Sequence, residues 1–357
     1  MKPIAHPSVN INHALIVQLR TYAAEADLLK QLHAQQLALI HQQKWFRLFV
    51  PEASGGLALS LPDALRLEES IAWIDGSIGW TVTLCAGAGW FIGFLDPELA
   101  AVLFADPAVC LAGSGKATGI AKKILGGYEV TGSWPHATGA AHATAFTANC
   151  VIEEKGLPVL EADGTPVIRS FAFLQNEVSV LNNWNSIGMR ATGSNAFEVK
   201  QTTIPENRCF IINSNTAFLQ DPIYQYPFLS FAEATLAVNH SGMAIRFLDL
   251  CETLIAERPN SMLQQLVQQG MQQIETCRHN LYAIIETSWA TCVSHQLLSA
   301  DTLLTIRNNS KQLAATARHV VDECYPHCGM LAADPDTEIN RVWRNLHTAS
   351  QHSLLNR

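Results

Sequence analysis

The sequence predicts an α+β protein, mainly helical, in which a β domain separates two helical domains. Apolar residues recur at helical spacing over the first hundred residues. Short β-like runs separated by Gly, Asn and Pro fill the middle of the chain, and helical patterns return after Tyr226–Pro227. These observations place an N-terminal helical domain at residues 1–107, a central antiparallel β domain at 108–220 and a C-terminal helical domain at 221–357.

Composition limits the classes of function. The 357 residues carry a formal net charge of -8 and no basic run longer than Lys122–Lys123, which argues against a nucleic acid or an anionic membrane as partner. A small-molecule site is therefore expected. The nine cysteines stand in apolar contexts and the N-terminus lacks the order of a signal peptide, which indicates reduced thiols in a cytoplasmic protein.

The first helical region opens with a periodic stretch over residues 12–47, which "PEASGG" ends. A second helix is predicted over residues 61–74, because Ser60 can cap it and Pro62 suits its first turn. The uncharged run from Ile78 to Leu95 is close to the length of a membrane span. Its glycines and its acidic flanks favour a buried core helix instead.

The middle region predicts strands in "GYEVTGSW", "ATAFTANCVI", "SVLNNW" and "NAFEVKQTTI". Turn residues between these runs favour an antiparallel arrangement. Beyond them, helices are predicted over residues 228–257, 261–296 and 302–324 and in the closing stretch "RVWRNLHTASQH". Pro259 separates the first two of these helices.

Two glycine- or cysteine-containing motifs have ordinary structural interpretations. "GSGKATG" (Gly113–Gly119) matches neither phosphate-loop spacing, and the residues after it predict a strand and a turn; a nest of backbone amides around a ring carbonyl or an anion stays open. "CYPHC" (Cys324–Cys328) lacks a second ligand pair and indicates buried thiols, so no metal site is predicted. A G-x-S-x-G motif is absent from the sequence, so a hydrolase of that kind has no support.

Two of the thirteen histidines stand apart from ordinary surface and core positions. His136 lies in "SWPHATG", where strand alternation would place Trp134, His136 and Thr138 on one face. His352 follows the aromatic and basic residues of the closing helical stretch.

Five segments in order resemble the acyl-CoA dehydrogenase superfamily, over nearly the whole chain. They are "VPEASGG", "EESIAWIDGSIGW", "GGYEVTGSWPHATG", "WNSIGMRATGSNAFEV" followed by "IPENR", and "INRVWRNLHTASQH". The resemblance implies an N-terminal helical domain, a central β domain and a C-terminal four-helix bundle. It also implies a flavin between the last two domains and a homo-oligomer, usually a tetramer.

The dehydrogenases of the superfamily need a carboxylate that takes a proton from the substrate. The position that matches this glutamate is Ser353, and no Asp or Glu occurs from Asn345 to Arg357. Because some branches place the glutamate on another helix, Glu233 and Glu252 remain as alternatives.

"GGYEVTGSWPHATG" and "WRNLHTASQH" are more similar to the two-component flavin monooxygenases of the same superfamily. Those enzymes receive reduced FMN or FAD from a separate reductase and use oxygen to hydroxylate aromatic or other small substrates. By this likeness, His352 is the catalytic residue, either deprotonating a phenol or steering the activated oxygen.

The same likeness assigns the remaining site residues. It puts His136 at the aromatic position beside the flavin ring and Thr138 at the hydroxyl near N5, where a hydroxyl can donate or accept as the ring changes redox state. The other candidates for cofactor contact are Ser114, Trp134 and Gly329. The candidates for substrate contact are Trp90, Met189 and Arg190. For Arg190 a structural ion pair is an equal alternative.

Two departures from the hydroxylase pattern bear on function. The helix after "GW" lacks the histidine that these hydroxylases often carry there, and the chain ends five residues after His352, which favours FMN over FAD. Three functions follow in order: an oxygenase of a two-component system, an acyl-CoA dehydrogenase-like enzyme acting on CH-CH donors with FAD, and a non-catalytic homologue that binds a ligand or serves assembly.

Overall fold

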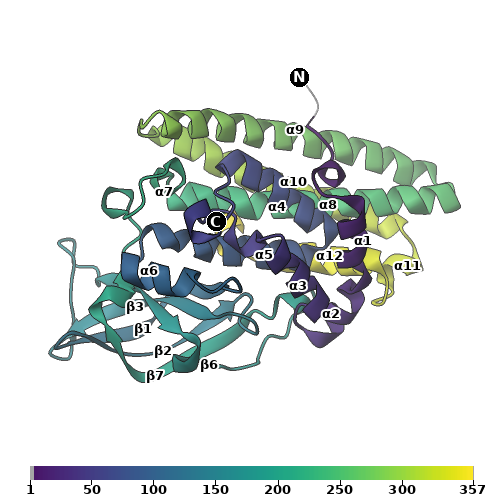
Figure 1. Cartoon of the computed structure of the whole chain (residues 1–357). Helices are drawn as coiled ribbons and strands as arrows, with labels where there is room; N and C mark the ends of the chain where they lie inside the picture. Colours follow the sequence, from purple (N-terminus) through teal and green to yellow (C-terminus); the bar gives the residue numbers. More distant parts are fainter. Residues whose placement is uncertain (1–3, 357) are drawn as a thin grey trace.

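A computed structural model describes residues 4–356. The N-terminal helices are α1 (His13–Thr21), α2 (Ala23–Leu29), α3 (Ala34–Gln42), α4 (Leu61–Ile74), α5 (Gly76–Gly89) and α6 (Pro97–Phe104). Figure 1 shows α4, α5 and α6 between the sheet and the long C-terminal helices, and α1, α2 and α3 to one side. As predicted, Ser60 Oγ accepts a hydrogen bond from Asp63 N at the start of α4, and Pro62 lies in its first turn.

The periodic stretch 12–47 is divided into three short helices. Lys30 adopts a left-handed conformation that ends α2, and His33 then forms a capping box at the start of α3. The uncharged run Ile78–Leu95 falls in α5 and the short helix Trp90–Gly93 and is largely buried. Across the described residues, no helix has both the length and the apolar character needed to cross a membrane.

The central domain is one mixed sheet. Its strands are β1 (Leu111–Ile124), β2 (Gly127–Ala137), β3 (Ala145–Glu154), β4 (Leu157–Pro158), β5 (Ile168–Leu174), β6 (Ser179–Val180), β7 (Asn195–Pro205) and β8 (Cys209–Phe210). The order is β6-β7-β2-β1-β3-β5-β8, with β4 beside β3.

The prediction of an antiparallel sheet was wrong for one pair, because β1 and β3 are parallel. β2 turns back beside β1 as a hairpin and pairs with β7 on its other edge. The chain then crosses the end of the sheet, and β3 enters on the free side of β1 in the same direction. Residues 138–144 form this crossing between β2 and β3.

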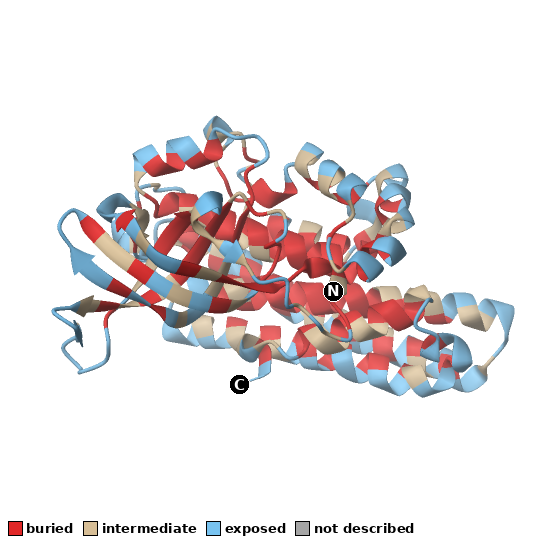
Figure 2. Cartoon of the chain, turned by 90° about the horizontal axis from the view of Figure 1, so that it is seen from below, coloured by how far each residue is buried: buried red, intermediate tan, exposed pale blue. Residues whose placement is uncertain are grey.

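The C-terminal domain is built around α8 (Phe228–Glu257), which is buried over most of its length. It packs against α4, α5, α9 (Ser261–Val293), α10 (Ala300–Cys324) and α12 (Glu338–Ala349). The short helices of this region are α7 (Pro222–Gln225), α11 (Met330–Ala333) and α13 (Ser353–Asn356). Figure 2 shows the result: buried residues gather where the N-terminal helices, the sheet and α8 meet, and the outer helices expose one side.

A buried ion pair joins the N-terminal helices to the bundle. Arg278 of α9 donates from Nε to Glu69 Oε1 of α4 at 2.9 Å and from Nη2 to Glu69 Oε2 at 2.8 Å. The hydroxyl of Tyr282 donates to the same carboxylate at 2.9 Å. Glu69 raises the pKa of Arg278 although burial acts in the opposite direction, so the guanidinium stays charged inside the protein.

Candidate functional site

The end of β2 does not follow simple strand alternation. A register shift occurs between Trp134 and Ala137, and His136 has a φ of 64°. The prediction that Trp134, His136 and Thr138 share one face was therefore wrong. Trp134 and Thr138 are buried, whereas His136 is exposed.

Trp134 belongs to the core of the sheet. Its side chain is 0% exposed, and its Nε1 donates to the carbonyl of Asn149 at 2.9 Å. Gly119 and Gly132 leave the space that its ring fills, since a Cβ at either would lie within 2.6 Å of an indole atom. With no exposed surface, Trp134 has no route to a cofactor, which corrects its place in the predicted cofactor set.

Thr138 stands at the head of a chain of hydroxyls. Its Oγ1 lies 2.8 Å from Ser194 Oγ, which lies 2.7 Å from Thr192 Oγ1. Thr192 Oγ1 donates to the carbonyl of Met189 at 2.7 Å. Because each hydroxyl has a single proton, this last bond sets the direction of the others: Ser194 donates to Thr192, and Thr138 donates to Ser194. Thr138 Oγ1 is left with lone pairs and acts as an acceptor.

The segment that carries this chain is tied to α12. Asn345 Oδ1 accepts from Met189 N at 2.7 Å, and Thr348 Oγ1 accepts from Gly188 N at 3.0 Å. Gly188 has no space for a side chain, because a Cβ there would lie 2.0 Å from the carbonyl oxygen of Arg344. Met189, a predicted substrate residue, is 2% exposed in this arrangement.

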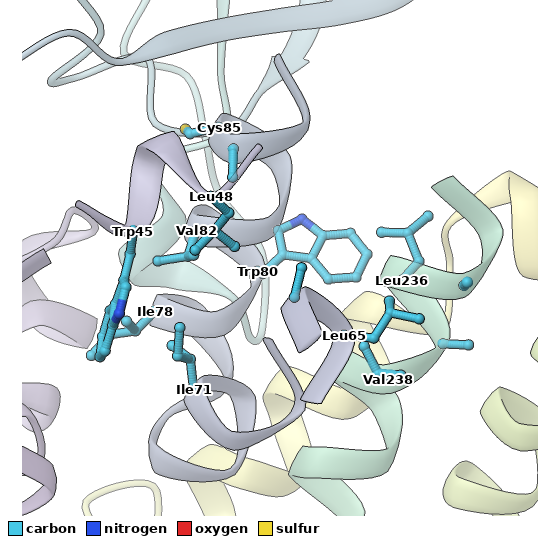
Figure 3. Packing of buried hydrophobic residues seen from close by; sticks show 14 of the residues in the cluster. Trp45, Leu48, Leu65, Ile71, Ile78, Trp80, Val82, Cys85, Leu236 and Val238 are labelled. Atoms are coloured by element: carbon cyan, nitrogen blue, oxygen red, sulfur yellow. The ribbon is translucent and has the colours of Figure 1, made fainter. Parts of the chain in front are cut away.

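His352 lies between α12 and α13, beyond this anchored stretch. Its ring packs edge to face on Trp80 of α5, with centroids 5.7 Å apart. Figure 3 shows Trp80 reaching from α5 towards Leu236 of α8. The N–H of Leu354 donates to His352 Nδ1 at 3.4 Å, which leaves the proton of the neutral ring on Nε2.

Two predicted site histidines, His352 and His136, are distant in the sequence, but the charge of His136 affects the pKa of His352. Burial lowers the pKa of His352, and the nearby His136 lowers it further. Loss of hydration lowers the pKa of His136, and so does Lys116. His136 also lies edge to face on Trp184, with ring centroids 6.0 Å apart. Both lowered pKa values favour neutral imidazoles at pH 7.

A third histidine at this place was not singled out from the sequence. His240 of α8 is 0% exposed, its Nδ1 lies 2.8 Å from the carbonyl of Leu236, and its ring centroid is 6.3 Å from that of Trp80. Burial lowers its pKa to about 4. It borders a small cavity of about 60 Å³ together with Ser350 and Arg318. Its sequence context, "LAVNHSGMA", gave only the signal of a histidine inside an apolar helix.

The remaining predicted residues lie elsewhere. Trp90 is 1% exposed, donates from Nε1 to the carbonyl of Ile223 and stacks on Phe231, so the structure corrects its assignment to substrate contact. Arg190 donates to the carbonyl of Asp27 and lies 3.7 Å from its carboxylate, which is the structural ion pair left open by the sequence.

Two predicted cofactor residues, Ser114 and Gly329, lie in different parts of the fold. Ser114 is half-buried at a register shift in β1, which contains "GSGKATG" as well as the residues after it that were predicted to form a strand. Gly329 precedes α11, which Figure 1 shows far from the sheet. A hollow of about 660 Å³ lies beside His41 and Arg47, and none of the predicted site residues lines it.

Residues 226–357 match the family model of the acyl-CoA dehydrogenase C-terminal domain. Relatives align along nearly the full length: the oxygenase subunit HsaA of a flavin-dependent monooxygenase from Mycobacterium tuberculosis H37Rv is 23% identical over 95% of this chain and 89% of that protein. Residues 226–357 therefore belong to the acyl-CoA dehydrogenase C-terminal domain family, and the chain as a whole is similar to flavin-dependent monooxygenases.

Solved structures of similar proteins agree with this fold. The 3-HSA hydroxylase from Rhodococcus sp. RHA1 superposes with a TM-score of 0.90 at 23% identity, covering 99% of this chain and 94% of that one. XiaF from Streptomyces sp., in complex with FADH2 and glycerol, superposes with a TM-score of 0.85 at 21% identity, covering 98% and 93%. A pigment production hydroxylase from Rhodococcus sp. is 32% identical over 52% of this chain and 48% of that protein.

Proposed function

We propose that this protein is the oxygenase component of a two-component flavin monooxygenase, which hydroxylates a small, phenol-like substrate. The observation that carries the proposal is the hydroxyl chain that leaves Thr138 Oγ1 as an acceptor, two residues after His136, whose charge lowers the pKa of His352. The named activities of the relatives support it, since they are monooxygenases and hydroxylases. In this function a separate reductase supplies the flavin.

The donors and acceptors of the site fit a reduced flavin. When bound, reduced flavin supplies the two electrons that activate oxygen. N5 of the ring carries a proton in the reduced state and is an acceptor in the oxidised state. Thr138 Oγ1 is an acceptor, because its own proton is directed to Ser194. The hydroxyl chain therefore favours the reduced ring over the oxidised one.

His352 would hold a proton at Nε2 and present it to an oxygen atom. Leu354 N–H occupies Nδ1, so protonation of that nitrogen is disfavoured, and burial keeps the ring neutral. This arrangement supports hydrogen bonding to the substrate or to activated oxygen more than removal of a proton by Nε2. The edge of Trp80 closes one side of His352 and excludes water from it.

A dehydrogenase is the weaker alternative because the chain offers no suitable carboxylate. Glu233 Oε1 accepts from Arg307 Nε at 2.9 Å, and Glu252 is exposed on α8. Glu68 is fully buried in α4, and its burial raises its pKa well above the usual value, so it is protonated and cannot act as the base.

The cofactor and the assembly are also proposals. We infer FMN rather than FAD, although related structures contain FADH2 in one case and FMN in another. We also infer a cytoplasmic homotetramer. Apolar side chains exposed on the outer helices support assembly: Met262, Leu304, Met330 and Leu331 are 48–83% exposed. Light scattering of the purified protein would give the number of subunits.

The test of function is an anaerobic titration with FMN and FAD in both redox states, followed by oxygen and a panel of phenols. We expect tighter binding of reduced flavin and a product that is one oxygen atom heavier than its phenol by mass spectrometry. His352→Asn should bind reduced flavin and lose the product, while the exposed control His319→Asn should keep both. Tighter binding of oxidised flavin, or no flavin binding, would contradict the proposal.

A further inference from the structure

A cluster of metal-ligating side chains lies next to Thr138, outside the groups used above. Cys85 comes from α5, Cys110 from the segment before β1, and His142 from the crossing between β2 and β3. Their ligand atoms all lie within 4.8 Å of one another. Cys85 and Cys110 are buried and His142 is half-buried. Figure 3 shows Cys85 at the end of α5 that faces the strands.

The backbone leaves space where these atoms converge. Gly139 has a φ of +80°, and a Cβ there would lie 2.7 Å from Cys85 Sγ and 3.1 Å from His142 Nε2. His142 Nε2 is buried and finds no hydrogen-bond partner among residues 4–356. A buried imidazole nitrogen without a partner costs free energy unless something occupies its lone pair or takes its proton.

The charges of the cluster match a divalent metal ion. Zinc binds cysteine as the thiolate and histidine as the neutral imidazole. Two thiolates and a neutral imidazole around a divalent cation have no net charge, which suits a buried position.

We propose that Cys85, Cys110 and His142 bind Zn²⁺ and that the metal fastens α5 to the sheet. Thiolate and imidazole are the ligands that zinc prefers. The Cys85 thiol donates to the carbonyl oxygen of Thr138, with Sγ and O 3.6 Å apart, so once the metal has replaced this proton the same oxygen can serve as the fourth ligand. In a tetrahedral zinc site, with Zn–S of about 2.3 Å and Zn–O of about 2.1 Å, sulfur and oxygen are separated by about 3.6 Å.

The binding step involves no electron transfer. Zinc replaces the proton of each thiol that is still protonated, the protons pass to the solvent, and the metal stays divalent. A closed site with four protein ligands has no position for a substrate, so the metal is structural. It holds the crossing that begins at Thr138, and its binding requires no flavin.

The test uses the purified, reduced full-length protein, stripped of metal with a chelator and titrated with Co²⁺ and then Zn²⁺. We expect one Co²⁺ per chain, with sulfur-to-cobalt charge-transfer absorption and visible d–d bands of a tetrahedral site. Zn²⁺ should bleach these bands and raise the unfolding midpoint. X-ray absorption of the zinc form should show two sulfur ligands.

Substitutions of the three residues test which side chains bind the metal. Cys85→Ser and Cys110→Ser should each lose the charge-transfer band, and His142→Ala should weaken metal binding at least tenfold. The matched control is Cys251→Ser, which removes an equally buried thiol whose Sγ lies 3.5 Å from that of Cys328 in the bundle. It should retain one metal per chain.

Three results would overturn the proposal. The first is a wild-type protein that binds no stoichiometric Co²⁺, a test that needs no variant to fold. The second is binding that persists unchanged in the folded Cys85→Ser and Cys110→Ser proteins, which would place the metal on other groups. The third is a Cys85–Cys110 disulfide that reforms in the presence of Zn²⁺. Because no flavin is present in any arm, failure of the proposed oxygenase function would leave these results unchanged.

Discussion

At the scale of single residues, the carbonyl of Met189 determines what Thr138 can offer to a ligand. It accepts the hydroxyl proton of Thr192. Ser194 must then donate its proton to Thr192, and Thr138 must donate its proton to Ser194, so that only lone pairs of Thr138 Oγ1 remain for a ligand. A side chain that is ambiguous in sequence becomes an acceptor through its neighbours.

This direction gives a prediction for Thr138→Val. The variant should weaken binding of reduced flavin about fivefold to tenfold, the equivalent of about 1 kcal/mol for one hydrogen bond, and affect oxidised flavin less. Anaerobic calorimetric titration measures both. Thr138→Ser should restore the affinity, and Thr203→Val, at an exposed position of β7, should leave it unchanged. Equal losses for both redox states would remove Thr138 from N5.

A second prediction concerns His240 and pH. Its folded-state pKa of about 4 lies below the ordinary value of 6.5, so the unfolded chain binds the proton more strongly. The protein should keep its full stability above pH 6.5 and lose about 3 kcal/mol from this group as pH falls to about 4. Urea unfolding at several pH values measures this loss.

The control for this prediction is His240→Leu, whose free energy of unfolding should depend less on pH between 6.5 and 4 than that of the wild type. His319→Asn, at an exposed histidine, should leave the profile as it is. A wild-type profile that is flat between pH 6.5 and 4 would contradict a neutral buried imidazole.

Sequence reasoning at this scale identified chemical types better than positions. It proposed His352, His136 and Thr138 as site residues, but alternation could not foresee that the bulge at His136 turns Trp134 into the sheet core. Thr192 and Ser194 lay inside "GMRATGS", yet only Met189 and Arg190 were considered as site residues there. Which polar side chain faces a site depends on local backbone geometry that residue types alone do not specify.

At the scale of elements, the contact between residues 182–194 and α12 positions the hydroxyl chain. We predict that Gly188→Ala lowers the free energy of unfolding by about 1–3 kcal/mol, because its Cβ would lie 2.0 Å from the carbonyl oxygen of Arg344. Product formation should fall with it. Gly115→Ala is the matched control, since a Cβ there meets nothing within 4 Å. Equal stability of the two variants would show that this contact can relax freely.

Local signals predicted local structure well. Ser60 and Pro62 begin α4 as expected, and the residues after "GSGKATG" form a strand and a turn, because capping and turn preferences act within a few residues. The parallel pairing of β1 with β3 was missed because it depends on the path of the chain after the hairpin. Strand composition is nearly the same for either direction of pairing.

At the scale of the whole molecule, the pair Glu69–Arg278 holds the N-terminal helices against the bundle. We predict that Arg278→Met destabilises the protein by about 3–5 kcal/mol, because Glu69 would remain buried without a cation. Arg318→Met is the control: its exposed pair with Asp322, at 3.9 Å, should cost less than about 1 kcal/mol. Chemical unfolding of both variants measures the difference, and similar losses would contradict the prediction.

The order of helical, β and helical regions was predictable because periodicity is repeated over many residues, and the fold agrees. The convergence of Cys85, Cys110 and His142 was not predictable, since Cys85 stands in another domain than the other two and the three show no ligand spacing. The motif that looked most like a metal site, "CYPHC", contributes buried thiols in the bundle. Sites formed between domains leave little trace in a linear motif.

Trp80 gives the protein an optical reporter at the place where the chemistry is proposed. Its indole packs on His352 and lies beside His240, whereas Trp90 and Trp134 are sealed in apolar cores. A flavin ring seated near His352 would quench the emission of Trp80 by energy transfer, so arrival of the cofactor can be timed by stopped-flow fluorescence without a label. Trp80→Phe would separate this signal from that of the other tryptophans.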